Sequence, residues 1–289
     1  MTLPHDPNLT RVILVSCHHM ASRSTATRTR SRHTWVQPAR PHTKQRRYRR
    51  LRRFIGLVMV CGLLLLASWV YALHVYAPGL RSEVRAIPTL VNAEVVANGG
   101  TYVTESEISP NLLHAIVAIE DWRFYYHPGI DPLGIARALW INAQHEHIDQ
   151  GGSTLEEQLA KRAIVHDDST IRAKLRTMAL AWAIDQEFSK PKILEEYLNA
   201  AYFGQGAYGA AAAARIYFGT DAAQLTVPEA AFLAALPQAP SIYGDHPNAP
   251  SVVARKNTVL SDMAKYGYIS SAQAAAAQTT RLTFALPNP

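Results

Sequence analysis

The run EDWRFYYHPG, residues 120–129, gathers more reactive side chains than any other part of the sequence. It places two adjacent acids, Glu120 and Asp121, at the end of an apolar segment and follows them with aromatic residues. Aromatic surroundings desolvate a carboxylate and raise its pKa toward the range of a general acid or base. The plainer interpretation is a solvated helix end, although the helix dipole does not favour acids there. The run predicts a catalytic carboxylate, and Glu120 is the candidate.

A second cluster, QGGSTLEEQLAK, covers residues 150–161. Glycines permit close backbone approach, and Ser153 with Glu156 has the spacing of a capping box that starts a helix. The free N–H groups of a helix start bind anions, and Lys161, about two turns in, reinforces such a site. The cluster predicts a site for a phosphate-bearing substrate. Its simpler interpretation is a glycine turn before a well-capped helix.

Two further segments carry polar groups at helix starts. RKNTVL, residues 255–260, puts Arg255 and Lys256 where the helix dipole disfavours cations, which indicates a ligand role unless they form a solvated face. SKPKILEEYLNAAYFGQGAYG, residues 189–209, formally contains the Ser-x-x-Lys of penicillin-binding enzymes at Ser189 and Lys192. No Lys-Thr-Gly accompanies it, so a transpeptidase module is not expected.

These groups must be positioned mainly by helices. Ser109-Pro110 starts a helix that ends at Glu120, and further helices are expected after Ser153 and Ser189 and over residues 208–215, 226–236 and 251–265. Another has one apolar stripe at helical spacing, formed by Ile171, Leu175, Met178 and Trp182. Inward-facing residues of the helix after Ser189 are Ile193, Leu194, Tyr197 and Leu198. The β-branched residues in 92–100 predict one strand in an otherwise mainly α domain.

Residues 54–73 form an uncharged apolar run of 20 residues, about 30 Å as a helix, which matches a bilayer core. Arginines crowd its N-terminal side, whereas only Arg81 and Arg85 follow closely, so the positive-inside rule keeps the N-terminus cytoplasmic and exports the rest. A cleaved signal peptide is the alternative, but its apolar region is shorter. We therefore expect a single-pass protein of the cytoplasmic (inner) membrane with an extracytoplasmic, periplasmic domain.

The basic charge lies almost entirely before this run. Residues 1–53 hold 13 of the 29 Lys and Arg residues and one acid, Asp6, a formal charge of +12 that leaves −5 for the rest of the total of +7. Such a tail is expected to be disordered, and its arginines set topology and read inner-leaflet lipids rather than nucleic acid. The only cysteines are Cys17 and Cys61, which excludes disulfides and thiol chemistry in the exported part.

Along the chain, EDWRFYYHPG, QGGSTLEEQLAK, SKPKILEEYLNAAYFGQGAYG and RKNTVL resemble, in order and spacing, the first, second, fourth and fifth motifs of the peptidoglycan glycosyltransferases of class A penicillin-binding proteins and monofunctional transglycosylases. The resemblance covers residues 105–270, and Asp131 with Arg137 continues the first motif. It implies a lysozyme-like helical domain with a membrane-facing jaw at residues 130–150. We expect a tail (1–53), a transmembrane helix (54–73), a linker (74–104), the glycosyltransferase domain (105–280) and a C-terminal tail (281–289).

The resemblance also implies the chemistry. Glu120 would deprotonate the 4-hydroxyl of an acceptor sugar, which attacks C1 of a lipid-linked donor (lipid II) with inversion and releases polyprenyl diphosphate. The implied partners are the growing glycan chain, the membrane, and transpeptidases and other cell-wall synthases. The residues implied to bind substrate are Asp121, Phe124, His127, Arg137, Ser153, Thr154, Gln158, Lys161, Lys174, Tyr202 and Arg255.

The chain departs from the family pattern in its third motif, where Ala173, Lys174 and Thr177 stand for Arg, Lys and Glu. An arginine usual near Ser169 is also absent, although Arg172 or Arg176 is in reach of the same place. In the second motif Glu156-Glu157 replaces Thr-Gln, and Glu157 at helical spacing would pair with Lys161.

The role of the two acids of the second motif, the need for a cation and the activity itself stay open. In one hypothesis, Glu156 or Glu157 substitutes for the lost carboxylate and holds a divalent cation, Mg²⁺ or Mn²⁺, against the diphosphate. In the alternative, the two acids only form a capping box and are favoured by the helix dipole, and the sequence requires no cofactor. A rival function is a catalytically impaired member that binds lipid-linked glycan or cell-wall partners. A second rival is a lysozyme-like muramidase with Glu120 as its acid.

Overall fold

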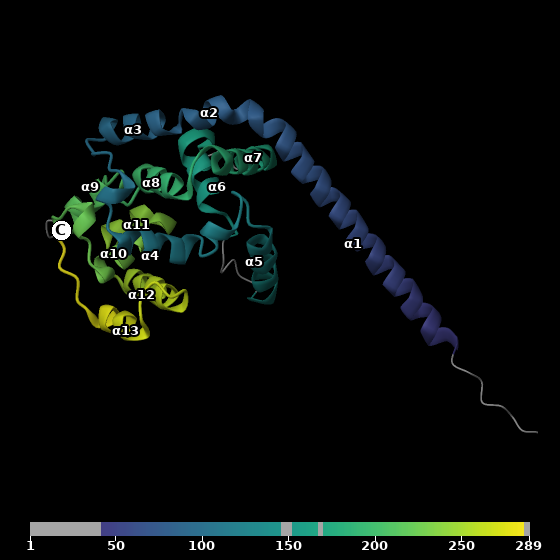
Figure 1. Ribbon diagram of the computed structural model, residues 1–289. Helices are drawn as coiled ribbons and strands as arrows, with labels where there is room; N and C mark the ends of the chain where they lie inside the picture. Colours follow the sequence, from purple (N-terminus) through teal and green to yellow (C-terminus); the bar gives the residue numbers. More distant parts are fainter. Residues whose placement is uncertain (1–41, 146–151, 167–169, 286–289) are drawn as a thin grey trace, which may run out of the picture. The chain divides into compact units, whose positions relative to one another are not determined.

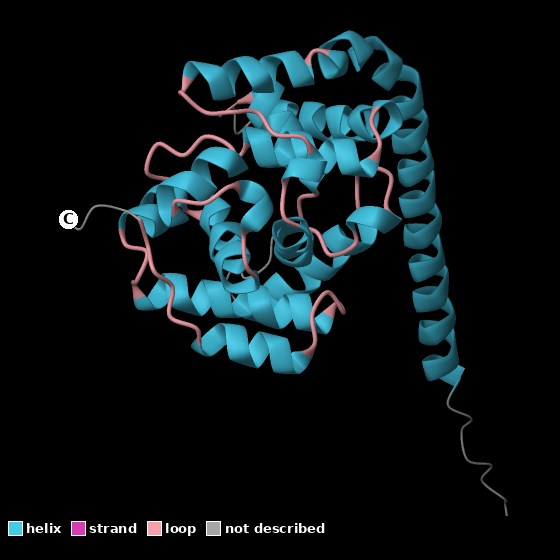
Figure 2. Cartoon of the chain, turned by 60° about the vertical axis from the view of Figure 1, so that its left-hand side comes forward, coloured by secondary structure: helices cyan, strands magenta, loops and turns pink. Residues whose placement is uncertain are grey.

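The computed structural model describes residues 42–145, 152–166 and 170–285, and within these ranges the chain is mainly helical (Figure 1, Figure 2). The described residues contain no strand, only an isolated antiparallel bridge between Tyr202 and Tyr208. The predicted mainly α fold class is confirmed. The helices are α1 (His42–Tyr76), α2 (Arg81–Arg85), α3 (Ile87–Ala97), α4 (Pro110–Glu120), α5 (Pro132–His145), α6 (Leu155–Ala160), α7 (Ile171–Glu187), α8 (Lys190–Ala200), α9 (Ala210–Phe218), α10 (Val227–Ala235), α11 (Pro240–Asp245), α12 (Pro250–Lys265) and α13 (Ser271–Thr279).

Helix α1 carries the apolar segment expected to cross a membrane. Leu51–Ala72 is a 22-residue stretch with a mean hydropathy of 2.3, and it is the one helix of the described residues that is long and apolar enough to span a bilayer. The helix begins at His42, so residues 42–53 are helical and not disordered as predicted. Arg, Lys and Gln are good helix formers, which lets a basic flank continue the helix. The remainder of the predicted tail, residues 1–41, lies outside the described residues.

The β-branched run before residue 100 forms helix α3, and the predicted strand is wrong. Ile87, Val91 and Val95 recur at four-residue spacing, and each is at most 1% exposed. Helix α3 packs against α8. Burial of an apolar face outweighs the weak strand preference of valine. Helix α3 therefore belongs to the folded domain, although residues 74–104 were expected to form a linker.

Helices α4, α10 and α12 contact one another in pairs and form the first part of the core (Figure 1). Helix α4 starts as predicted, since the Ser109 side chain accepts a hydrogen bond from the Asn111 N–H and Pro110 occupies the first helical position. Leu112 and Ile116 on α4 are fully buried. The helix ends at Glu120, so this packing fixes the position of the candidate carboxylate.

A second group is built from α6, α7 and α8, with α6 packed on both of its neighbours. The four predicted inward residues of α8 are all at most 1% exposed. The predicted stripe of α7 is wrong at its first two residues, since Ile171 is 82% and Leu175 45% exposed, whereas Trp182 packs against the core. The buried face of α7 instead carries Leu180 and Ile184, which are fully buried, beside the small residues Ala173 and Ala181.

Helix α6 starts one residue later than the capping box predicts. Thr154, not Ser153, is the cap, and its Oγ1 accepts the Glu157 N–H at 3.2 Å. The Glu156 carboxylate does not return to the helix start, because it accepts a hydrogen bond from Lys190 at 2.6 Å. The Thr154 hydroxyl in turn donates to the Gly129 carbonyl at 2.7 Å. These bonds join the second motif to the end of the first.

Gly129, at the end of the first motif, is held in a conformation that suits only glycine. Its φ is +78°, and a Cβ added there would meet the backbone carbonyl of Ala181 on α7. Gly99, at the end of α3, shares the left-handed backbone, with φ +72°, but has open space around it. A side chain at Gly99 would therefore meet backbone strain alone, whereas one at Gly129 would meet both strain and steric conflict.

Gly129→Ala should lower the free energy of unfolding by roughly 3 kcal/mol or more, because strain and backbone overlap add. Gly99→Ala should cost only about 1–2 kcal/mol, the strain alone. Denaturation of the detergent-solubilised variants, followed by circular dichroism, measures both. Equal losses would contradict the contact with α7.

Candidate functional site

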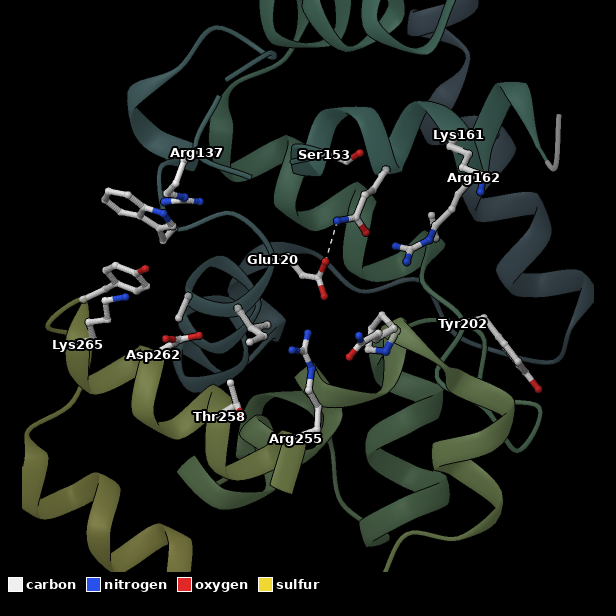
Figure 3. A pocket seen from close by; sticks show the side chains of 18 of the residues that line it. Glu120, Arg137, Ser153, Lys161, Arg162, Tyr202, Arg255, Thr258, Asp262 and Lys265 are labelled. Carbon is white, nitrogen blue, oxygen red and sulfur yellow. Dashed lines mark hydrogen bonds between the residues drawn. The ribbon is translucent and has the colours of Figure 1, made fainter. Parts of the chain in front are cut away.

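Glu120, the last residue of α4, is positioned by α6. Its Oε2 accepts a hydrogen bond from Gln158 Nε2 at 2.8 Å, the dashed line at Glu120 in Figure 3. Gln158 Oε1 lies 3.2 Å from the donating Tyr197 hydroxyl. Tyr197 is fully buried, and burial raises its pKa to about 12, a shift that the nearby Arg162 opposes. The hydroxyl therefore remains a donor, and the carboxylate is held by a chain of neutral groups.

Glu120 lies in a cleft of about 890 Å³. The cleft is lined from α4, α5, α6, α12 and the segments around Tyr202 and Pro237. In Figure 3, Arg137, Ser153, Arg162 and Arg255 surround the carboxylate from different elements. Seven of the sequence-predicted site residues line the cleft: Glu120, Arg137, Ser153, Gln158, Lys161, Tyr202 and Arg255.

The cleft has more cations than acids. Its described lining contains three carboxylates, those of Glu94, Glu120 and Asp262. The lining also contains five Lys and Arg side chains, from Arg137, Lys161, Arg162, Arg255 and Lys265. A concave surface lined mostly by one sign of charge concentrates ions of the other sign. The arrangement suits an anionic substrate that reacts beside a carboxylate.

The five remaining predicted residues do not line the cleft. Asp121, Phe124, His127 and Thr154 are buried, and Lys174 pairs with an acid beside the cleft. Phe124 packs in the core, with the Lys190 ammonium 4.6 Å from its ring centroid. Their contacts support the cleft wall from behind.

Asp121 links the first two motifs. Its Oδ2 accepts hydrogen bonds from the Leu155 N–H at 3.1 Å and from His127 Nε2 at 2.9 Å. Leu155 N and Glu157 N are thus both satisfied within the protein, the second by Thr154. The sequence predicts an anion site at this helix start; for these two N–H groups that prediction is wrong, because oxygens of the protein itself accept their hydrogen bonds.

The charges around His127 form a buried network. Burial disfavours the imidazolium, but the hydrogen bond and charge of Asp121 and the charge of Glu156 outweigh burial and raise the pKa of His127. Burial also raises the pKa of Glu156, against the influence of Lys190. Lys190 donates to Glu156 at 2.6 Å and to the His127 carbonyl at 2.8 Å, and it forms an ion pair with Asp185 at 2.7 Å. This network holds the first motif against α6 and α8.

Lys174 and Glu157 make an ion pair that their sequence spacing does not predict. Lys174 Nζ lies 2.5 Å from Glu157 Oε2 and 3.2 Å from Ser153 Oγ. Glu157 is 2% exposed. The expected pairing of Glu157 with Lys161 is wrong, because the acid points toward α7 while Lys161 is exposed.

The third-motif position Thr177 is buried at 6% exposure and donates to the Ala173 carbonyl at 2.9 Å. It is not among the described residues that line the cleft. Ser169, the position of another departure, lies outside the described residues, as do Gln150 and Gly151 and residues 146–150 of the expected jaw. Within that jaw, α5 exposes Leu133 and Trp140 at 66% and 68%.

Trp122 and Tyr266, here called the Trp122–Tyr266 strap, line the cleft and were not predicted as site residues. The rings of Trp122 and Tyr266 stack in parallel, with centroids 4.8 Å apart. Arg137 lies 5.3 Å from the Trp122 centroid and Lys265 lies 5.0 Å from that of Tyr266. Stacking of this kind fixes cations that would otherwise be free to move. No sequence signal joins residues 122 and 266, which only the tertiary fold brings together.

The two cations of the fifth motif, Arg255 and Lys256, lie in different surroundings. Arg255 lines the cleft, whereas Lys256 is buried and places Nζ 3.5 Å from the carbonyls of Ala277 and Gln278. Burial lowers the pKa of Lys256. Asp262 lines the cleft two helical turns after Arg255, and burial raises its pKa against the opposing charges of Lys265 and Arg255.

Comparisons with known proteins agree with the arrangement. Residues 89–264 match the family model described as Transglycosylase. Penicillin-binding protein 1A of Escherichia coli (strain K12) is 37% identical over 235 residues, which is 76% of this chain and 28% of that protein. Penicillin-binding protein 1A of Aquifex aeolicus (strain VF5) is 43% identical over 172 residues, 60% of this chain and 24% of that protein. The chain spans about a quarter of the length of these relatives.

A solved structure is also similar to part of the chain. The 2.6 Å crystal structure of penicillin-binding protein 1A from Haemophilus influenzae has 22% sequence identity and a TM-score of 0.37, and the match covers 64% of this chain and 18% of that one.

Wild-type protein should lose stability relative to His127→Gln as pH rises. The folded pKa of His127 is raised above its ordinary value of 6.5, so its stabilising contribution is complete below about pH 6.5 and disappears as pH rises through the folded pKa. Urea midpoints of both proteins between about pH 5.5 and 9 measure the difference. A difference that is constant with pH would contradict the charged His127–Asp121 pair.

Proposed function

Because the chain belongs to the transglycosylase family, we propose that it polymerises lipid-linked disaccharide-peptide (lipid II) into peptidoglycan glycan strands. The observation that carries the proposal is Glu120, held by Gln158 inside a cleft whose described lining has five Lys and Arg side chains against three carboxylates. A carboxylate can accept a proton, and the surrounding cations complement a diphosphate. Both parts of the reaction thus have matching groups in one cleft.

In the proposed reaction, Glu120 takes the proton from the 4-hydroxyl of the acceptor sugar. That oxygen forms a bond to C1 of the donor sugar while the bond from C1 to the diphosphate oxygen breaks. The electron pair of the broken bond leaves with the polyprenyl diphosphate, and the configuration at C1 inverts. The Glu120 carboxylate must be fixed for this transfer, and its hydrogen bond to Gln158 supplies that restraint.

None of the three carboxylates in the described lining of the cleft belongs to a group with metal-ligand spacing, so the proposed mechanism is written without a protein-held divalent cation. The group of the described residues with metal-ligand spacing is Asp121, His127 and Glu156, which is buried and bonded within itself and to Lys190. None of the three lines the cleft. Mg²⁺ or Mn²⁺ at the diphosphate would therefore take its ligands from the substrate rather than from a protein cluster.

An impaired, glycan-binding member is the second candidate. The pairing of Lys174 with Glu157 favours it, since this ion pair reduces the charge available for a leaving diphosphate. A lysozyme-like muramidase is disfavoured, because cleavage of a finished glycan has no use for a cleft rich in Arg and Lys. The retained Glu120 and Arg255 favour the polymerase.

We propose that the protein sits in the cytoplasmic membrane with its N-terminus inside. Both proposed substrates are held in a bilayer, so an anchored enzyme meets them at the membrane surface, and Leu51–Ala72 has the length of an anchor. The exposed Leu133 and Trp140 of α5 fit contact with lipid. Its proposed partners are lipid II, the growing glycan, the membrane, transpeptidases and other cell-wall synthases.

Glu120→Gln should reduce glycan polymerisation by roughly 10²–10⁴-fold, because the amide cannot accept the proton. The assay uses lipid-linked disaccharide precursor and detergent-solubilised protein, with and without Mg²⁺ or Mn²⁺. Asp221→Asn, an exposed carboxylate paired loosely with Arg215 at 3.5 Å, is the control and should polymerise normally. A wild-type protein that binds the precursor without polymerising it would instead establish the impaired member.

Labelling with a membrane-impermeant maleimide should modify Thr283→Cys, an exposed position of the exported domain, in intact spheroplasts. Cys17 should react only after the membrane is permeabilised, and Cys61, inside the apolar helix, should stay unlabelled in both cases. Labelling of Cys17 in intact spheroplasts would reverse the proposed orientation.

A further inference from the structure

The two lysines assigned to the diphosphate from the sequence are poorly placed for it. Lys174 is in an ion pair with Glu157 at 2.5 Å and does not line the cleft. Lys161 lines the cleft but is exposed, where water screens its charge. A lysine at the surface also loses side-chain entropy when it binds. The diphosphate subsite therefore needs another cation.

Arg162 lines the cleft and belongs to none of the sequence-predicted site residues. It follows Gln158 by four residues, which places both side chains on one helix face, and it lies in the π-helical turn Lys161–Val165 that follows α6. Such turns are frequent at functional sites because they re-aim side chains. Figure 3 shows Arg162 and Arg255 extending toward Glu120 from separate elements.

The guanidinium of Arg162 is fixed but incompletely bonded. Its central carbon lies 4.6 Å from the centroid of the buried Tyr197 ring. Its Nη1 is buried and has no hydrogen-bond partner among the described residues. An unpaired buried donor is costly and gains most from an incoming anionic acceptor. This state differs from that of Lys174, whose charge is already matched.

We infer that Arg162 binds the diphosphate of the lipid-linked substrate, with Arg255 on the other side of Glu120. This inference rests on the proposed function and deepens it, because it assigns the leaving group to a residue outside the expected lysines. The planar fork of arginine donates two parallel hydrogen bonds to phosphate oxygens, which a lysine cannot do.

Tyr197 gives the subsite a link to the reacting carboxylate. Its ring supports the Arg162 guanidinium, and its hydroxyl donates to Gln158, whose amide donates to Glu120. The buried Tyr197 side chain would thus fix the position of a diphosphate bound to Arg162 relative to Glu120. Positioning of both groups on a rigid element is what a group transfer requires.

The test measures diphosphate binding apart from turnover. Detergent-solubilised full-length protein is titrated with geranylgeranyl diphosphate, and geranylgeraniol serves as the uncharged probe. The variants are Arg162→Gln, Arg162→Lys, and the double variant Glu157→Gln with Lys174→Gln, which removes the ion pair without leaving a buried charge. Arg215→Gln is the matched control, because Arg215 is an exposed arginine that does not line the cleft. Thermal unfolding of each variant checks its fold.

Arg162→Gln should lower affinity for the diphosphate by roughly tenfold or more and leave binding of geranylgeraniol unchanged. Arg162→Lys should recover part of the loss, since it restores charge without the fork. The double variant should lose less than Arg162→Gln, and Arg215→Gln should match wild type. A loss in Arg162→Gln of less than twofold, or a larger loss in the double variant, would overturn the inference.

Polymerisation separates this inference from the function on which it rests. If wild-type protein binds the diphosphate through Arg162 but makes no glycan, the polymerase proposal fails and the Arg162 subsite stands. If wild-type protein makes glycan and Arg162→Gln binds the diphosphate normally, the subsite fails and the polymerase proposal stands. Wild-type protein that does not bind the diphosphate at all overturns the subsite.

Discussion

The site depends on one buried carboxylate, that of Asp121, which lies between two parts of the chain 34 residues apart. It accepts the first free N–H of α6, from Leu155, and a hydrogen bond from His127. An anion at a helix N-terminus is favoured by the backbone dipoles, and its burial strengthens the attraction. This bond sets α6 against the end of α4, so Glu120 and Gln158 meet. The Thr154–Gly129 hydrogen bond and the contacts of Lys190 join the same parts of the chain beside it.

The same bond gives the second motif a structural role at its helix start. Its helix start is filled from within the protein, by Asp121 and by Thr154, so those N–H groups contribute to the scaffold rather than to substrate binding. The positive charge of the cleft then has to come from side chains, and the lining shows five Lys and Arg residues for it. Two of them, Arg137 and Lys265, are held by the Trp122–Tyr266 strap, and Arg162 is held by Tyr197. Aromatic rings thus orient cations without neutralising them.

The departures from the third motif also acquire a physical explanation. Thr177 is buried and bonded to its own helix, and the acid that reaches Lys174 comes from α6 instead. Glu157 is therefore a structural partner of Lys174, joined across the contact between α6 and α7. The hypothesis that an acid of the second motif supplies a carboxylate near the third motif agrees with this geometry. The idea that it holds a cation receives no support from it, since the acid is already paired with an ammonium group.

The sequence by itself determined the helical class, the apolar span and the central carboxylate, because periodicity, helix caps and motif spacing are local properties. Seven of the predicted site residues do line the cleft with Glu120 among them. Only the tertiary structure decided which charges remain available. In the tertiary structure the predicted strand is helix α3, and the first residues of the α7 stripe are exposed. Glu157 pairs with Lys174, and Arg162 lines the cleft. Each of these outcomes depends on which helix lies opposite, and neither spacing nor composition contains that information.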